Sequence, residues 1–236
     1  MPPNNMFERP AGSHTLAAAA QHDVRPMGAM HIANINWADF FRPAFPDLDA
    51  SRAFIECVEA VPAATSKAKI VIHQAARMLW LGDRMDEVAT GRPALQVLFQ
   101  LIAAEAVAKL ANNFTAEGES RKHVRLFFED ICSDSHRTAL GKAFSHAPGG
   151  PFLSVREAVD CLYDIRCDVV HEGVYSTLTL TRPGDTLKWL TPSASGKGSL
   201  IAGITVQQLR QIVLEGAIRG AVRLLPAGSL CAQLAP

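Results

Sequence analysis

A helix with clear signals at both ends is the feature that most constrains how this chain folds. Between residues 155 and 170, apolar side chains recur every three or four positions, and this spacing places them on one face of an α-helix. Ser154, with Glu157 three residues later, predicts a capping box at the beginning of the helix. Gly173 follows the last turn, where glycine readily takes the left-handed conformation that ends many helices. The apolar stripe consists of Val155, Val159, Leu162, Ile165, Val169 and Val170.

The last turns of this helix hold an arginine and a histidine at a fixed spacing. Four residues separate Arg166 from His171, and the fuller string is Tyr163-Asp164-Ile165-Arg166, then Val170-His171-Glu172-Gly173. This arrangement resembles the Arg-x4–6-His motif of HEPN domains and is most similar to the Apea-like branch of that family. The resemblance covers roughly residues 92–225 and does not extend to the N-terminal part of the chain.

The resemblance implies a fold and an activity. HEPN domains are antiparallel bundles of four or five helices, and their ribonucleases build a metal-independent site across a homodimer. By this resemblance Arg166 would bind and stabilise the phosphate, His171 would transfer protons, and Asp168 would orient the histidine. Some HEPN domains also place an acidic residue of the first helix near the motif, so Glu105 joins the candidate catalytic residues. The implied partners are RNA and an antitoxin or another protein, in a toxin or phage-defence role.

The chemistry of these side chains suits RNA cleavage. Without a metal, the reaction needs a base for the 2′-hydroxyl proton, an acid for the leaving 5′-oxygen and a cation for the phosphorane charge. Histidine suits the proton transfers, and a guanidinium group can bind a phosphate with two donors. In an ideal helix, residues five apart lie about 140° apart around the axis. Arg166 and His171 therefore converge only if the helix end unwinds, or if a second copy of the helix supplies the missing neighbour.

Two other functions are compatible with the same residues. The residue after Arg166 is Cys167, whereas active members of the family commonly have a polar residue there. This difference favours a non-catalytic helical module that binds RNA, a nucleotide or a protein partner. A purely structural interpretation of the same residues pairs Arg166 with an acid such as Glu105 and makes His171 a cap at the helix end. A structural or assembly protein is the third interpretation, and an aromatic N-terminal arm would suit it.

Composition supports a packed core and argues against two classes of binding protein. Of the 236 residues, 48% are hydrophobic and 19% are charged, so wholesale disorder is not expected. The formal net charge is zero, which argues against a nucleic-acid coat or a polybasic membrane binder, because their affinity rests on phosphate neutralisation. No histidine pair has a zinc-ligand spacing, and Gly196-Lys197-Gly198-Ser199 lacks the P-loop spacing. We therefore expect no metal and no cofactor.

The cysteines and the apolar segments predict a cytoplasmic protein. The five cysteines are odd in number and show no Cys-x-x-Cys spacing, so we expect free, buried thiols in a reducing cytosol. Residues 1–14 lack the apolar core of a signal peptide. The most apolar run, residues 94–110, includes glutamines, a glutamate and a lysine, and we expect it to be too short and too polar to cross a bilayer. No membrane contact is expected.

The whole pattern predicts a mainly α-helical chain: an antiparallel four- or five-helix HEPN-like bundle with a small β-hairpin insertion and a helical N-terminal extension. We expect a tail and an aromatic arm over residues 1–50, the extension over 51–91, the HEPN-like domain over 92–225 and a tail over 226–236. The boundary falls in the polar stretch 82–91. The predicted helices cover residues 51–61, 66–82, 93–110, 120–132, 136–146, 155–172 and 205–225.

Two details of the C-terminal half complete the prediction. A threonine-rich alternating stretch at 175–181 and a second strand at 186–190 predict a β-hairpin inserted at about 174–191. In the final helix, Gly216 and Gly220 are four residues apart, and they would let another helix approach closely.

Overall fold

The computed structural model describes residues 36–62, 67–114, 118–146, 149–173, 179–180, 184, 186–187 and 200–236. The chain divides into two units, Met1–Asn34 and Ile35–Pro236, and every described residue belongs to the second. The predicted N-terminal tail up to residue 35 lies outside the described residues. The predicted aromatic arm is described only from Asn36 onward.

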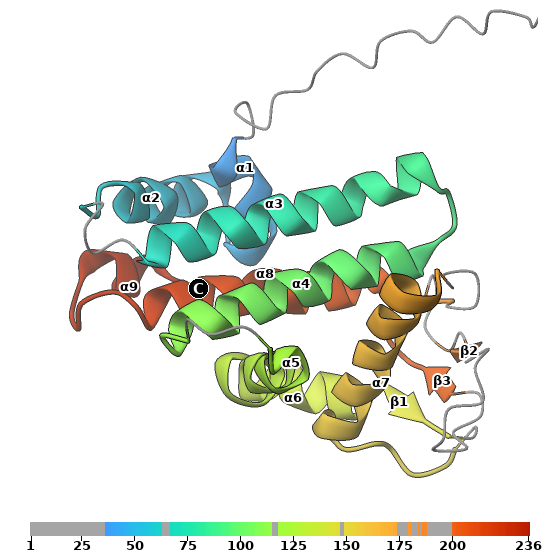
Figure 1. Cartoon of the computed structure of the whole chain (residues 1–236). Helices are drawn as coiled ribbons and strands as arrows, with labels where there is room; N and C mark the ends of the chain where they lie inside the picture. The colour runs from blue at the N-terminus through green and yellow to red at the C-terminus, as the bar shows by residue number, and fades with distance from the viewer. Residues whose placement is uncertain are drawn as a thin grey trace, which may run out of the picture. The chain divides into compact units, whose positions relative to one another are not determined.

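The described part of the chain is mainly helical, as the sequence predicts (Figure 1). Short pieces of strand lie only toward its C-terminal half. In chain order the elements are α1 (Trp37–Phe41), the 3₁₀-helix η2 (Arg42–Ala44), α2 (Leu48–Glu59), α3 (Lys67–Val88), α4 (Pro93–Ala111), α5 (Ser120–Leu126), the π-helix η4 (Phe127–Ile131), α6 (Asp134–Gly141), β1 (Phe144–Ser145), α7 (Val155–Cys167), the π-helix η5 (Asp168–Glu172), β2 (Thr186–Leu187), β3 (Leu200–Ala202), α8 (Val206–Val222) and α9 (Leu230–Leu234).

Helix α4 is the centre of the bundle. It contacts α3 and α8, which lie beside it in Figure 1, and it also contacts α5 and α7. Pro93 occupies its first turn, as predicted, because proline lacks the N–H that would have no partner there. By length and composition alone this 19-residue helix is apolar enough to cross a membrane. Burial among its neighbours accounts for that composition without a membrane, and the absence of membrane contact stays a prediction.

The N-terminal helices share the core of the predicted HEPN-like domain. Phe54 of α2 and Leu79 of α3 belong to the same buried cluster as Leu101 of α4 and Leu209 of α8. The residues 51–91 and 92–225 thus lie within one unit of the chain. The predicted end of α3 at residue 82 is wrong, because this helix continues to Val88.

Gly82 shows why the helix end was misplaced. A Cβ atom at this position would lie 3.2 Å from the Cβ of Phe99 and 3.4 Å from the carbonyl oxygen of Gln96 on α4. The glycine therefore permits close packing of α3 against α4 and does not terminate the helix. A glycine that serves packing cannot be told from a terminating glycine by sequence position alone.

The two glycines of α8 do permit the close approach that their spacing predicts. A Cβ atom on Gly216 would overlap the ring of Phe127, and one on Gly220 would overlap Cγ1 of Val107. Both neighbours are fully buried, so neither has free space into which it can move. The small residues therefore set the distance from α8 to α4 and to the π-helix η4.

Substitution of Gly216 by alanine is expected to lower the free energy of unfolding by about 2 kcal/mol, because overpacking a filled core is costly. This loss exceeds the gain of about 1 kcal/mol that alanine brings to a helix. Gly141→Ala is the matched control, since its added Cβ would lie 3.6 Å from Val155, at ordinary contact distance. Urea unfolding of both variants measures the difference. Equal stability of Gly216→Ala and the wild type would contradict this packing.

An ion-pair ladder fixes α7 against α5 and η4. Arg121 Nη2 lies 2.5 Å from Asp164 Oδ1, and the guanidinium group of Arg125 binds both carboxylate oxygens of Asp160, at 2.7 and 2.8 Å. The third pair joins Arg156 of α7 to Glu129 of η4. In this pair the arginine is on α7, whereas in the first two pairs the arginine is on α5. Residue numbers rise on one side as they fall on the other, so the helices are antiparallel. A slip by one turn would bring Arg125 against Arg156, and the exchanged signs therefore specify the register.

The strands form a small antiparallel sheet in the order β1-β3-β2. Thr186 pairs with Ile201 and Leu187 pairs with Leu200, so the described part of the predicted second strand pairs with β3. Most of the predicted first strand, residues 175–181, lies outside the described residues. Strand β3 was not predicted, because its three residues do not alternate between polar and apolar and are too few to show a strand pattern. Burial of Leu200 and Ala202 holds this strand in place.

The C-terminus is not the simple tail that the sequence predicts. Residues 230–234 form α9, and Cys231 makes a disulfide with Cys57 of α2, 174 residues away in sequence. The expectation of free thiols is thus wrong for this pair, because spacing cannot reveal which distant cysteines meet. Cys132, Cys161 and Cys167 are not disulfide-bonded. Disulfides are rare in reducing compartments, so the cysteines no longer support a cytoplasmic location, which stays a prediction.

Reduction of the Cys57–Cys231 bond is expected to lower the free energy of unfolding by about 2–4 kcal/mol, because the crosslink restricts the unfolded chain. The control is a Cys57→Ser/Cys231→Ser variant, whose stability should not respond to reductant. Alkylation in denaturant without reductant should modify only the three cysteines outside the disulfide. Modification of all five before reduction would contradict the disulfide.

Candidate functional site

The helix that carries the candidate motif has both of its predicted ends. Ser154 and Glu157 form the capping box, with the Ser154 side chain accepting from the Glu157 backbone and the Glu157 side chain accepting from the Ser154 backbone. Gly173 ends the helix with φ = 64°, in the left-handed region. Between these ends, the last turn changes from an α-helix to the π-helix η5, and the N–H of Gly173 donates to the carbonyl of Asp168.

This π-helical turn changes the relation between Arg166 and His171. A π turn contains one residue more than an α turn, so side chains five residues apart come nearer to one face than they do in an ideal α-helix. His171 is exposed at this end of the helix. Asp168 occupies the first position of η5, three residues before the histidine. Convergence of the two side chains was expected only with local unwinding or a second chain, and the wider turn of η5 is a local change of this kind.

Arg166 is held in place by contacts on two helices. Its Nη2 lies 3.3 Å from Oε2 of Glu105 on α4, and its Nη1 donates to the hydroxyl of Tyr163 at 3.2 Å. The guanidinium carbon also lies 5.1 Å from the centre of the Tyr163 ring. The arginine side chain is only 18% exposed. The structure thus brings together Arg166 and Glu105, two of the candidate residues.

Glu105 is the buried centre of this cluster. Its Oε1 accepts from the hydroxyl of Ser120 at 2.7 Å and pairs with Nζ of Lys109 at 2.8 Å. Burial opposes ionisation of Glu105 and is the largest single influence. The contacts from Lys109 and Ser120, with the charge of Arg166, outweigh it and hold the pKa of Glu105 below its usual value. The carboxylate is therefore ionised at neutral pH and neutralises part of the charge on Arg166. We refer to Glu105, Lys109, Ser120, Tyr163 and Arg166 as the α7 cluster.

Several members of this cluster were not predicted from the sequence. Lys109 stands four residues after Glu105, and Tyr163 stands three residues before Arg166, so helical spacing alone carried a signal for both. Ser120 comes from another helix, and no local pattern could place it. Arg121 is a further neighbour, with its guanidinium carbon 4.6 Å from the Tyr163 ring centre. The Tyr163 ring is thus in contact with two cations.

His123 lies near the same cluster and was not singled out by its spacing. Its side chain is buried and packs against Phe114, with ring centres 4.2 Å apart. Within the described residues, neither ring nitrogen has a hydrogen-bond partner. Burial, followed by the positive charge of Lys109, lowers the pKa of His123. The neutral form of this histidine is therefore the one compatible with the packed helix.

The charges around the α7 cluster are mixed. Lys109 and Arg166 alternate with Glu105, and Arg121 is paired with Asp164. The α7 cluster therefore presents alternating positive and negative groups rather than a uniform basic surface. Among the described residues, no group of three or more His, Cys, Asp or Glu side chains is placed to hold a metal ion.

No family model, curated protein or solved structure matches this chain. The likeness to HEPN domains therefore rests on the motif in the sequence, and the geometry of the α7 cluster must carry any functional conclusion.

Proposed function

We propose that this chain is a HEPN-like, metal-independent endoribonuclease that acts at the end of α7, in a cleft shared by two copies. The observation that carries the proposal is the π-helical turn η5, which follows an anchored arginine and ends with an exposed histidine. Arg166 would bind the phosphate and stabilise the charge of the transition state. His171 would transfer protons, and Asp168 would orient it.

The contacts of Arg166 support a role in phosphate binding. Glu105 and Tyr163 fix the position of the guanidinium group before any ligand arrives, so less conformational entropy is lost on binding. The group carries more N–H donors than these contacts use, including one on each terminal nitrogen. Donors at fixed positions are what stabilisation of a phosphorane requires. Glu105 would act through Arg166, as a positioning residue.

The chemistry supports a shared site. Transesterification needs an acid and a base at opposite oxygens of the same phosphate, and one α7 helix supplies one histidine. Two helices related by a twofold axis would supply two. The proposed partners are accordingly a second copy of the chain and RNA. By the family resemblance, we also propose a cytoplasmic toxin or phage-defence role with an antitoxin or other protein partner.

The test is incubation of the purified full-length protein with a mixed RNA pool in excess EDTA. Attack by the 2′-hydroxyl predicts products with 2′,3′-cyclic phosphate and 5′-hydroxyl ends. DNA of the same sequence is the matched control substrate, because it lacks the attacking group and must remain intact. Cleavage of that DNA, or RNA products with 5′-phosphate ends, would contradict the proposed chemistry.

A second candidate function is favoured by the ion pair between Arg166 and Glu105. An arginine that is already neutralised, followed by Cys167, would suit a non-catalytic module that retains RNA, a nucleotide or a protein partner. Retention of intact RNA by the wild-type protein, with no cleavage, would replace the nuclease proposal by this one. Retention should then weaken in Arg166→Ala but not in Arg210→Ala, an arginine of similar burial that is paired with Asp83.

A further inference from the structure

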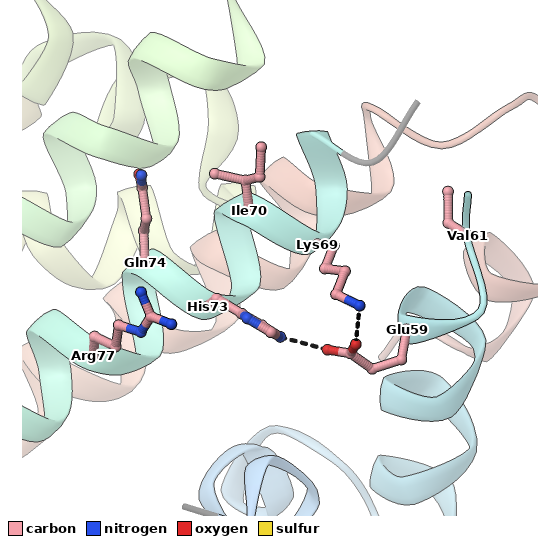
Figure 2. Close-up of a pocket in the computed structure, with 7 residues that line it drawn as sticks. All are labelled: Glu59, Val61, Lys69, Ile70, His73, Gln74 and Arg77. Atoms are coloured by element: carbon pink, nitrogen blue, oxygen red, sulfur yellow. Dashed lines mark hydrogen bonds and ion pairs between the residues drawn. The ribbon is translucent and has the colours of Figure 1, made fainter. Parts of the chain in front are cut away.

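A second cluster of basic residues lies far from α7 in the fold. Helices α2 and α3 lie on the opposite side of α4 from α5 and α7 (Figure 1). Between the end of α2 and the first half of α3 is a surface groove with a volume of about 440 Å³. Small-molecule sites have volumes in this range. We call it the α3 groove, and Figure 2 shows the residues that line it: Glu59, Val61, Lys69, Ile70, His73, Gln74 and Arg77.

Basic side chains occupy one strip of α3 in this groove. Lys69, His73 and Arg77 are each four residues apart, so they follow one another on successive turns of the helix (Figure 2). Glu59, the last residue of α2, pairs with both Lys69 and His73. Arg77 is exposed and forms no ion pair with another described residue. The single negative charge of Glu59 therefore cannot neutralise all of the positive charge on this strip.

The ionisation of Glu59 and the side chains at the edge of the groove restrict further which ligand can bind. Burial opposes ionisation of Glu59 and is the largest influence, but hydrogen bonds from Lys69 and His73 outweigh it and lower the pKa. The ring of His73 also stacks on the ring of Trp37, with ring centres 5.2 Å apart. The basic strip is therefore positioned before a ligand binds. Ile70, which is 43% exposed, adds an apolar edge.

We propose that the α3 groove binds an oxyanion, a phosphate or carboxylate group on a small ligand, through Arg77 and Lys69. The planar guanidinium group of Arg77 matches two oxygens of either anion, and Lys69 adds a second charge. Glu59 holds Lys69 and repels the incoming anion, so it competes with the ligand. This site is independent of the proposed ribonuclease function, and its test does not involve RNA cleavage.

Because Glu59 competes with the ligand, substitutions of Arg77 and of Glu59 should change binding in opposite directions. Binding of inorganic phosphate to the full-length protein is measured by calorimetry at low ionic strength, beside succinate as the carboxylate probe. Arg77→Ala is expected to weaken binding about tenfold, because a charge-assisted bidentate contact is lost. Glu59→Gln is expected to tighten binding severalfold. A purely structural ion pair would give neither effect.

The matched control is Arg84→Ala. Arg84 is another arginine of α3, but it pairs with Glu87 outside the groove. This variant should bind phosphate as the wild type does. Thermal melting of each variant confirms that it is folded. Tighter binding of phosphate than of succinate assigns the oxyanion to a phosphate ligand, and the reverse order assigns it to a carboxylate. Unchanged binding in Arg77→Ala, weaker binding in Glu59→Gln, or no binding of either probe by the wild type would overturn the proposal.

Discussion

Replacement of His171 by alanine is expected to slow RNA cleavage by about 10²–10⁴-fold, the usual contribution of a general acid or base. The histidine is exposed at the end of η5, so its removal should leave the core and the melting temperature unchanged. This combination separates a catalytic role from a structural one. The measurement is the initial cleavage rate in EDTA, together with the thermal melt of the same preparation.

His146→Ala is the control for this substitution, because His146 is also exposed but directly follows β1 and is not a member of the α7 cluster. It should cleave RNA at the wild-type rate. A His171→Ala variant that cleaves as fast as His146→Ala would remove the histidine from the mechanism. If both variants lost activity equally, the cleavage would not depend on the end of α7.

Replacement of Glu105 by glutamine is expected to lower the free energy of unfolding by about 3 kcal/mol, the lower end of the cost of breaking a buried ion pair. The lower end applies because Lys109 and Arg166 retain some exposure, with 27% and 18% of their side chains accessible. Without the carboxylate, both cations would be left in a partly buried site. Urea unfolding at neutral pH measures the loss.

The control for Glu105→Gln is Glu129→Gln, which breaks the pair with Arg156. That arginine is 62% exposed, so water can replace the lost partner and the stability should change little. Similar losses in both variants would show that Glu105 is not the buried centre of its cluster. Glu105→Gln should also lower cleavage, because Arg166 would no longer be positioned, but less than His171→Ala does.

The pH dependence of the same variant follows from the lowered pKa of Glu105. A carboxyl group with a pKa below its ordinary value of 4.5 in the folded state stabilises the fold above that pH, and the stabilisation is lost as the pH falls through the folded value. The stability difference between the wild type and Glu105→Gln should therefore shrink below pH 4.5. His123, whose pKa is also lowered, makes both proteins less stable below pH 6.5, and because the charge of Glu105 opposes that lowering, this loss should be larger in Glu105→Gln.

Much of the fold followed from local signals in the sequence. The capping box at Ser154 and the terminating Gly173 are properties of a few adjacent residues, and the structure has both. The close approach at Gly216 and Gly220 was also predictable, because small residues one turn apart leave room for a neighbour. Each of these signals is read within one or two helical turns.

The features that were missed depend on residues far apart in the chain. The disulfide joins cysteines 174 positions apart, and no spacing rule could have paired them. The end of α3 was misplaced because Gly82 packs closely against Phe99, which lies on another helix. The contact between Glu105 and Arg166 was an expectation, whereas Ser120 entered the cluster only through the packing of α5 on α4. Each of these features depends on tertiary packing, which a local sequence pattern does not reveal.

The central claim is that two copies of the α7 end share one ribonuclease site. The most direct measurement is the cleavage rate of a purified mixed dimer, with one wild-type subunit and one His171→Ala subunit carrying a different affinity tag. If the acid and the base come from different copies, the mixed dimer should lose nearly all of the wild-type activity, because it lacks one of the two groups. A rate of about half the wild-type value, as expected when each chain holds its own complete acid–base site, would contradict the claim.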